Sequence, residues 1–577
     1  MISRIRRRQP DPTVSPGAQT LSVHPVLRRV YAARGIHSVE DIDYRAARLL
    51  PPKGLDGLSE AAALVSRHLS EGPILIVGDF DADGATATAL LKSGLEAMGA
   101  AAVDYLVPNR FDFGYGLSPE LLEVARERDP ALIITVDNGI SSIEGVAAAR
   151  AAGIDVLVTD HHLPGETLPG ANAILNPNLP GQGFASPHLA GVGVAFYLLL
   201  GLRQHLRDAQ WFEQQAIPEP SLAEWLDLVA LGTVADLVPL DRNNRILVHQ
   251  GLQRIRAGSL RPGLEALIRV ADRNRADLTA ADLGFAIAPR LNAAGRLDDI
   301  SHGIETLLAR DPGRARAGAE KLDAMNRERR YLQRDMQEQA ERALERIKLD
   351  GGAELPAALT LFRTDWHSGI VGLLASRLKE RFHRPVAVMA PDGDRMLKGS
   401  LRSVPGIHIR DVLADMDSRQ PGMIERFGGH AMAAGLSLRS DRLDSFRRLF
   451  KEAVEARAGA ETLSGIIHSD GPLEVSELSL EVAELIRRHG PWGQGFPEPL
   501  FDGEFRVLEE RVVGEHHLKL RLQHPDAATP IDAIAFNPPP EQLGGLPEWI
   551  RIAYRLEVNE WQGLRRPQLL VVLIEPL

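Results

Sequence analysis

Between residues 72 and 240, short aliphatic runs alternate with alanine-rich helical segments, and this alternation constrains the fold more than any other feature of the chain. The aliphatic runs cover 74–77, 132–136, 156–158 and 173–175. Strands that alternate with helices are typical of parallel α/β sheets. Ligands of such sheets bind beyond the carboxyl ends of the strands, where this chain carries clusters of polar residues. The sequence therefore predicts an α/β domain with a binding site at one edge of its sheet.

Four clusters of carboxylates and histidines lie at the predicted strand ends or in loops. Taken alone, each has an ordinary structural explanation, because Asp/Gly runs occur in solvated turns and a single Asp often caps a helix. Together they could hold two divalent ions about 3.5–4 Å apart, an arrangement that activates a water and neutralises a phosphoryl group. The clusters are Asp79, Asp81 and Asp83; Asp137; Asp160, His161 and His162; and Asp236.

Composition narrows the kind of metal site. The chain contains no cysteine, which excludes disulfides, cysteine-ligated zinc, iron–sulfur clusters and thiol nucleophiles. A site built from carboxylates and imidazoles suits Mn²⁺ or Mg²⁺. The net charge of -11 disfavours a nucleic-acid-binding protein. Bound ions would neutralise part of that charge, however, and arginines can still gather in a local groove.

Length and local pattern predict several domains in a cytoplasmic protein. No run approaches about 18 apolar residues, so we expect no membrane span. The arginine-rich start of the chain is followed by no apolar segment, which argues against a signal peptide. We expect its first eight residues to form a disordered arm. The predicted divisions of the 577 residues are an N-terminal arm and helical segment (1–45), the catalytic α/β domain (46–310), a long connecting helix (311–350), a smaller α/β domain (351–460) and a C-terminal β-barrel (461–577).

The last three divisions follow from local sequence. Residues 311–348 are charged and carry no proline after Pro312, which indicates one long helix. In the smaller α/β domain, strands are expected at 359–362 and 386–389, helices at 370–381 and 443–456, and Gly/His-rich loops elsewhere. After residue 464, five short segments separated by turns predict a small antiparallel barrel of the OB type.

Several motifs resemble a known family. GDFDADG, VDNG, TDHH and GTVADLVPL are similar, in this order, to the four motifs of the DHH phosphoesterase superfamily, and GDFDADG resembles the RecJ version. PNRFDFGYGL (108–117), PRLNAAGRL (289–297) and NEWQG (559–563) extend the resemblance. WHSGIVGLLASRL (366–378), GSLRSVPGIHI (399–409) and FGGHAMAAG (427–435) resemble the DHHA1 domain of that family. Nearly the whole chain is covered apart from its first few dozen residues.

The resemblance implies a metal-dependent exonuclease that degrades single-stranded DNA from 5′ to 3′ in recombination and repair, with two Mn²⁺ or Mg²⁺ ions. It makes Asp137 a bridging ligand and leaves Asp79 either as a further ligand or as a support for the ligands. We expect Asp160 to orient His161, and His162 to face the scissile phosphate. By resemblance, the metal ligands are Asp81, Asp83, Asp137, His161 and Asp236, and the catalytic residues are His162, Asp137 and Asp160.

The resemblance also assigns contacts to nucleic acid. Arginine suits phosphate because its planar guanidinium binds two oxygens at once, although a surface ion pair is the ordinary role of each arginine. Tyr115, Trp366, Phe427 and Trp561 are candidates for base stacking, although a tryptophan in a small barrel is more often part of the core. The predicted contacts to nucleic acid or phosphate are Arg110, Arg290, Asn292, Ser400, Arg402, Gly428, Gly429, His430 and Trp561.

The expected partners are single-stranded DNA, a single-strand-binding protein and a RecQ-type helicase, with the chain acting as a monomer. One alternative is a DHH phosphodiesterase for short RNA, cyclic dinucleotides or pyrophosphate, which the length of the chain disfavours. Another is an inactive DHH replication scaffold, which the full set of Asp and His residues disfavours. A further alternative is that the barrel is only a structural cap.

Overall fold

The computed structural model describes residues 4–9, 22–108, 116–351, 355–459, 462–514, 516–539, 542–543 and 545–577, with the backbone alone at 345–351. The chain divides into two compact units. One comprises 8–326 and 470–577, and the other comprises 327–469 together with the N-terminal strand. The predicted parallel sheet and the barrel therefore belong to the same unit.

The first unit contains a five-stranded sheet in the order β3-β2-β4-β5-β6, and every neighbouring pair of strands is parallel. This confirms the predicted α/β fold. The sequence prediction included every strand except β3. The strands are β2 (Ile74–Gly78), β3 (Val103–Leu106), β4 (Leu132–Val136), β5 (Asp155–Thr159) and β6 (Ala173–Leu175).

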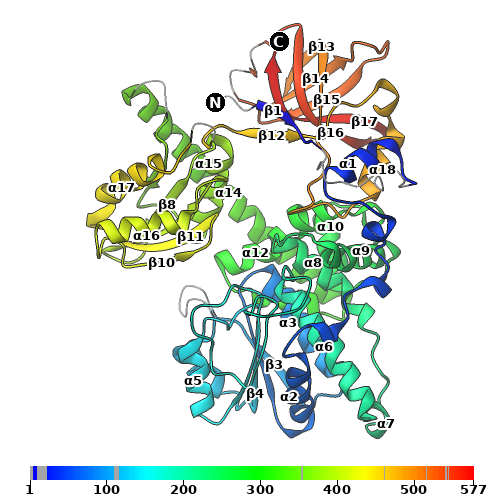
Figure 1. Ribbon diagram of the computed structural model, residues 1–577, viewed down its shortest axis with the longest axis vertical. Helices are drawn as coiled ribbons and strands as arrows, with labels where there is room; N and C mark the ends of the chain where they lie inside the picture. The colour runs from blue at the N-terminus through cyan, green and yellow to red at the C-terminus, as the bar shows by residue number, and fades with distance from the viewer. Residues whose placement is uncertain are drawn as a thin grey trace. The chain divides into compact units, whose positions relative to one another are not determined.

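Helices cover both faces of this sheet (Figure 1). Ile74 and Ile76 of β2 pack into the core that contains α2, α3 and α6, whereas Leu75 and Val77 pack against α4 and α5. Because both faces are covered, all residues of β2 and β4 are buried, as expected for central strands of a parallel sheet. These helices are α2 (Leu58–Glu71), α3 (Ala82–Ala97), α4 (Pro119–Arg126), α5 (Ile143–Ala151) and α6 (Gly191–Asp208).

A layer of helices follows the sheet in the chain. Its central helix α8 packs against α3 and α9 and is buried over almost its whole length, which explains why its sequence is apolar on all sides. A π-helical turn, Leu283–Ile287, connects α11 to α12. The helices are α7 (Trp211–Gln214), α8 (Leu226–Ala235), α9 (Arg242–Ala257), α10 (Pro262–Val270), α11 (Ala280–Asp282), α12 (Ala288–Leu297) and α13 (Ser301–Leu308).

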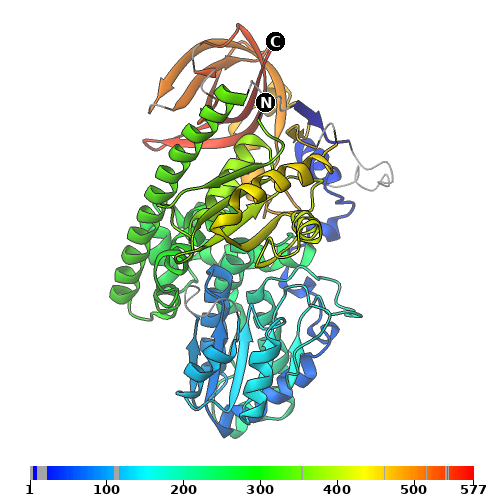
Figure 2. The ribbon, with the colours of Figure 1, turned by 90° about the vertical axis from the view of Figure 1, so that its left-hand side faces the viewer.

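The predicted long connector is a single helix, α14 (Pro312–Gly351), which Figure 2 shows as one continuous element. Its residues up to Asn326 belong to the first unit and those from Arg327 to the second.

The second unit contains a five-stranded sheet in the order β10-β11-β9-β8-β7. Only β7 and β8 run parallel. Helices α16 and α17 share an apolar core with this sheet. The prediction of Gly/His-rich loops is wrong at 399–402 and at 427–435, because much of that sequence forms β9, β10 and β11. The elements are β7 (Leu359–Phe362), α15 (Val371–Phe382), β8 (Val386–Pro391), β9 (Met396–Arg402), α16 (Ile409–Arg419), β10 (Arg426–Gly429), β11 (Ala433–Arg439) and α17 (Leu443–Glu455).

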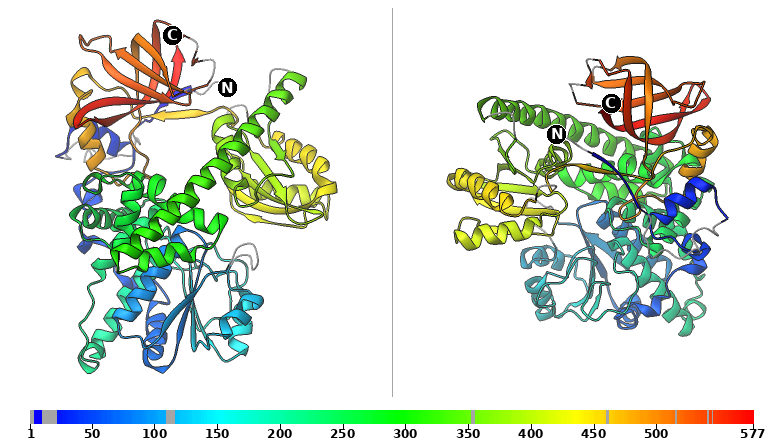
Figure 3. Two further views of the ribbon diagram at one scale, coloured as in Figure 1. Left: turned by 180° about the vertical axis from the view of Figure 1, so that it is seen from behind. Right: turned by 45° about the horizontal axis from the view of Figure 1, so that its top comes forward.

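The C-terminal strands form a closed barrel in the order β13-β14-β15-β17-β16 (Figure 3). Helices α1 and α18 contribute to its apolar core. The barrel is not wholly antiparallel as predicted, because β15 pairs with β17 in parallel to close it. The elements are α1 (Pro25–Ala32), α18 (Leu480–Arg488), β13 (Phe501–Val513), β14 (His517–Gln523), β15 (Ile531–Phe536), β16 (Trp549–Trp561) and β17 (Leu564–Pro576).

The described part of the arginine-rich start, from residue 4, is ordered, contrary to the prediction of a disordered arm. Strand β1 (Arg4–Arg7) pairs in parallel with β12 (Ile466–Ser469). In the first unit, Arg8 and Arg34 both bind the buried carboxylate of Asp470. Long-range pairing thus gives residues 4–7 a fixed conformation.

Among the helices of the described residues, none is both long enough and apolar enough to cross a membrane.

Candidate metal centre

Carboxylates and a histidine from the four sequence clusters meet beyond the carboxyl end of the parallel sheet. Asp79 and Asp81 follow β2, Asp137 follows β4, His161 follows β5, and Asp236 follows the last residue of α8. Their potential ligand atoms form groups of three within 4.8 Å of one another. These groups are Asp79, Asp81 and Asp137; Asp83, His161 and Asp236; and Asp137, His161 and His162.

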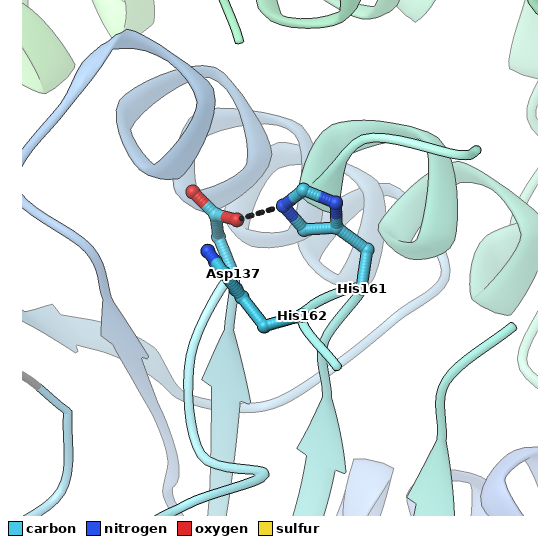
Figure 4. Close-up of side chains that lie close together, drawn as sticks. All are labelled: Asp137, His161 and His162. Atoms are coloured by element: carbon cyan, nitrogen blue, oxygen red, sulfur yellow. Dashed lines mark ion pairs between the residues drawn. The ribbon is translucent and has the colours of Figure 1, made fainter. Parts of the chain in front are cut away.

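His161 lies between two of the carboxylates. Its Nε2 atom is 3.0 Å from Oδ1 of Asp137 and 3.4 Å from Oδ2 of Asp236 (Figure 4 shows the first pair). Burial, together with the neighbouring His162, lowers the pKa of His161 to about 3. Its imidazole is therefore neutral near pH 7, which is the form that binds metal ions.

The buried carboxylates repel one another. Burial and the charge of Asp81 raise the pKa of Asp83 to about 7. Burial and the charges of Asp83 and Asp81 raise the pKa values of Asp137 and Asp236 well above the ordinary range. A divalent cation would remove this repulsion by binding the charged oxygens. The donor set of oxygens and one imidazole fits Mn²⁺ or Mg²⁺.

The backbone fixes two of these carboxylates. Oδ1 of Asp81 accepts hydrogen bonds from the N–H groups of Asp83 at 2.9 Å and Gly84 at 3.1 Å, and so caps α3. The side chain of Asp83 is fully buried, and its oxygens accept hydrogen bonds from the N–H groups of Gly191 at 2.6 Å and Val192 at 2.9 Å. These two amides begin α6, whose N-terminus favours a negative charge.

Two residues that support the site are not among the sequence predictions. The side-chain amide of Asn138 donates hydrogen bonds to the carbonyls of Val77 at 3.0 Å and Val136 at 2.9 Å, and so joins the ends of β2 and β4. Gly191 packs against Asp137 so closely that a Cβ atom on it would lie 2.6 Å from Cβ of Asp137. Asn138 stands within the quoted VDNG motif. Gly191 lies outside the quoted motifs, and only the fold brings it to the site.

Asp160 contacts the backbone of His161, whose N–H group donates a hydrogen bond to Oδ1 of Asp160 at 2.7 Å, but the ring that Asp160 holds is that of His162, so its orienting of His161 stays a prediction. Oδ1 of Asp160 lies 2.7 Å from Nδ1 of His162, and its Oδ2 accepts a hydrogen bond from the N–H group of Ile140 at 2.9 Å. Burial acts to lower the pKa of His162, but the hydrogen bond with Asp160 outweighs it and raises the pKa. Asp160 therefore orients the ring of His162, the residue predicted to face the phosphate, and favours its charged form.

The residues predicted from PRLNAAGRL contact the protein itself. Oδ1 of Asn292 accepts a hydrogen bond from the N–H group of Ala82 at 2.8 Å, which supports the loop of the first aspartate cluster. Arg290 is only 9% exposed. Its guanidinium pairs with Asp323 at 2.8 Å and donates to the carbonyl of Ala286. The phosphate contacts predicted for Arg290 and Asn292 stay predictions.

The predicted phosphate contacts of the second unit lie together at one end of its sheet. Ser400 and Arg402 alternate along β9, and Nη1 of Arg402 donates a hydrogen bond to Oγ of Ser400 at 3.0 Å. Through the strand pairing, Gly428 of β10 lies opposite Gly435 of β11, which in turn lies opposite Ser400. The sheet brings together Ser400, Arg402, Gly428, Gly429 and His430.

The predicted stacking residues differ in exposure. Trp561 is 72% exposed at the end of β16. Trp366 is buried, and its indole N–H donates a hydrogen bond to a glutamine side chain of α14 at 2.7 Å. Phe427 is half-buried and packs against the core of the second unit. The remaining predicted contacts, Arg110 and Tyr115, lie outside the described residues.

Comparison with known families and proteins supports one assignment. The models of the DHH family N-terminal domain, the DHHA1 domain and the RecJ OB domain match residues 73–233, 356–456 and 469–572. The single-stranded-DNA-specific exonuclease RecJ of Escherichia coli (strain K12) is 51% identical over 577 residues, which cover 100% of this chain and 99% of that protein.

Two crystal structures agree with this match. RecJ of Thermus thermophilus in complex with Mn²⁺ is 30% identical, with a TM-score of 0.80, and the match covers 100% of this chain and 79% of that one. The same protein in complex with Mg²⁺ gives a TM-score of 0.75 at 30% identity, with coverage of 100% and 78%. The predicted resemblance is thus confirmed by sequence, domain order and fold, and the chain belongs to the RecJ family of DHH phosphoesterases.

Proposed function

We propose that this chain is a metal-dependent exonuclease that hydrolyses single-stranded DNA. The convergence of His161 with Asp137 and Asp236 at the end of a parallel sheet carries this proposal. The match to proteins named single-stranded-DNA-specific exonucleases extends over the whole chain, barrel included. If the chain were an enzyme for short RNA or cyclic dinucleotides, its match to these exonucleases over the whole chain would be unexplained. The complete set of potential ligands argues against an inactive scaffold.

The ligands of the proposed centre are Asp81, Asp83, Asp137, His161 and Asp236. Asp79 is assigned as a further ligand, because one of its oxygens lies within 4.8 Å of those of Asp81 and Asp137. Two Mn²⁺ or Mg²⁺ ions, when bound, would activate a water molecule and neutralise charge on the phosphoryl group. Asp137 belongs to two of the three ligand groups, which fits a bridging position.

His162 is assigned to the scissile phosphate. It is more exposed than His161, with 36% of its side chain accessible against 11%. Asp160 holds Nδ1 of His162 and raises the pKa of the ring, which leaves Nε2 to donate a proton or a hydrogen bond. A charged imidazole at this place would stabilise negative charge that develops on a phosphate oxygen.

The contacts to DNA are assigned to two surfaces. Ser400, Arg402, Gly428, Gly429 and His430 of the second unit would bind backbone phosphates through side chains and N–H groups. The exposed ring of Trp561 on the barrel would stack on a base. This assignment also gives the barrel a role beyond that of a structural cap.

Family membership supports a proposal for the biological setting. We propose digestion from the 5′ end toward the 3′ end, during recombination and repair in the cytoplasm. The chain would act as a monomer on single strands supplied by a RecQ-type helicase and a single-strand-binding protein.

A digestion assay with Mn²⁺ tests the proposal. Single-stranded DNA labelled at its 5′ or 3′ end, duplex DNA and RNA are incubated in parallel with the protein. We expect rapid release of the 5′ label from single-stranded DNA and much slower digestion of the duplex. Cleavage confined to dinucleotides, or no Mn²⁺-dependent cleavage of any substrate, would contradict the proposal.

A further inference from the structure

The short link that follows Asp236 has a constrained conformation. Helix α8 ends at Ala235 and α9 begins at Arg242, so the link has few residues with which to set the position of Asp236. Leu237 has a φ of 61°, in the left-handed region. A leucine keeps such a conformation only where its surroundings impose it.

A loop of the C-terminal domain binds this link. We call residues 491–496, with the sequence PWGQGF, the clamp loop. The N–H group of Leu240 donates a hydrogen bond to the carbonyl of Gln494 at 2.7 Å. The carbonyl of Leu240 accepts one from Nη1 of Arg245 at 2.9 Å, and that guanidinium lies 4.3 Å from the ring centroid of Phe496. Both backbone polar groups of Leu240 are thus held by the clamp loop or by an arginine packed against it.

The clamp loop approaches the link closely. Gly495 has a φ of 70°, and a Cβ atom on it would lie 3.3 Å from Cβ of Pro239. A Cβ atom on Gly493 would lie 2.7 Å from Cδ1 of Leu240. The two glycines therefore allow the backbone of the loop to lie directly against Pro239 and Leu240.

The clamp loop is itself firmly anchored. The side chain of Phe496 is 2% exposed and belongs to the apolar core of the catalytic α/β domain. It stacks on Trp492, with ring centroids 5.1 Å apart and planes inclined by 12°. The indole N–H of Trp492 donates a hydrogen bond at 2.9 Å to the carbonyl of Ile486 in α18, which packs against the barrel. A continuous set of contacts thus runs from the barrel through the loop to the link.

We propose that the clamp loop is a positioning element for Asp236, through which the C-terminal domain sets the affinity of the metal centre. The inference rests on the proposed function, because it takes Asp236 as a metal ligand. The loop acts through the Pro239–Leu240 backbone, and a displaced link would move the Asp236 carboxylate away from Asp137 and His161. Residues that orient metal ligands commonly change metal affinity when they are altered.

Two glycine variants of the full chain test the proposal. Gly495→Ala adds a methyl group against Pro239 at a positive φ. Gly153→Ala is the matched control, because its φ is 80° and a Cβ atom on it would meet nothing within 4 Å. Both variants carry similar backbone strain, but only the first presses on the link. We expect Gly495→Ala to raise the Kd for Mn²⁺, measured by calorimetry or electron paramagnetic resonance, by roughly 10-fold. Gly153→Ala should bind as the unaltered protein does, and saturating Mn²⁺ should restore digestion by Gly495→Ala.

The possible results separate the two proposals. An unchanged Kd in Gly495→Ala, or an equal rise in both variants, would overturn the role of the clamp loop. Failure of the unaltered protein to bind Mn²⁺ would instead overturn the proposed function. If Gly495→Ala does not fold, Phe496→Leu is measured in the same way, because it removes the ring that packs against Arg245. A normal Kd in that folded variant would also overturn the inference.

Discussion

Binding of Mn²⁺ to the metal-free protein should release protons. Burial and mutual repulsion raise the pKa values of three carboxyl groups of the centre, which favours their protonated form in the absence of metal. The pKa of Asp83 is about 7, and those of Asp137 and Asp236 lie well above the ordinary range. A metal ion binds the deprotonated carboxylate, so each protonated ligand must lose its proton on binding.

The expected release follows from these pKa values. At pH 7 a group with a pKa of about 7 is half protonated, so Asp83 releases about 0.5 proton on metal binding. Asp137 and Asp236 each release at most about one proton. The total should therefore lie between about 0.5 and about 2.5 protons per protein molecule. His161, with a pKa of about 3, contributes none. At pH 8 the share of Asp83 falls to about 0.1 proton, so the release should decrease as the pH rises.

Calorimetric titration in buffers of different ionisation enthalpy measures this number. The apparent binding enthalpy changes linearly with the ionisation enthalpy of the buffer, and the slope gives the protons released. A matched titration of Asp83→Asn should show a smaller release at pH 7, because one titrating carboxyl group is absent. A release near zero at pH 7, or one that grows between pH 7 and pH 8, would refute this account of the electrostatics.

Three further predictions concern single residues. Asp137→Ala should abolish Mn²⁺-dependent digestion while leaving the binding of single-stranded DNA largely intact, and unchanged digestion would remove the catalytic assignment. Trp561→Ala should weaken the binding of single-stranded DNA by about 1–3 kcal/mol in a fluorescence titration without changing the Kd for Mn²⁺. If the variant and the unaltered protein bind single-stranded DNA equally well, the exposed ring does not stack on a base. Arg34→Ala should lower the free energy of unfolding by about 3 kcal/mol in a urea titration, because it removes a partner of the buried Asp470 carboxylate. A loss of stability below about 1 kcal/mol, which is typical of a surface ion pair, would contradict that reasoning.

The sequence predicted the catalytic sheet well, because its strands are determined by local pattern. Continuous aliphatic runs such as 132–136 and 74–77 are typical of strands covered on both faces, and both are central strands of the sheet. The same reasoning placed the Asp and His clusters at one edge, since the carboxyl ends of parallel strands lie together. The strands of the second unit were missed at 427–435, where glycines weaken the local preference for a strand, and pairing of β10 with β11 and of β11 with β9 forms them.

Tertiary contacts explain the other differences. Arg4–Arg7 forms a strand only because β12, more than 400 residues later, pairs with it. The carboxylate that Arg290 binds lies 33 residues away, on α14, and a motif in the sequence cannot reveal that pair. Asp160 precedes two adjacent histidines, and the backbone conformation alone decides which ring it contacts.

The most direct test of the metal centre is the anomalous X-ray scattering of crystals soaked in Mn²⁺ and measured at the manganese edge. The account predicts two peaks about 3.5–4 Å apart. One should lie beside His161 and Asp236 and the other beside Asp79 and Asp81, with Asp137 in contact with both. A manganese peak remote from these side chains, or no peak near them at saturating Mn²⁺, would contradict the claim that they form the metal centre.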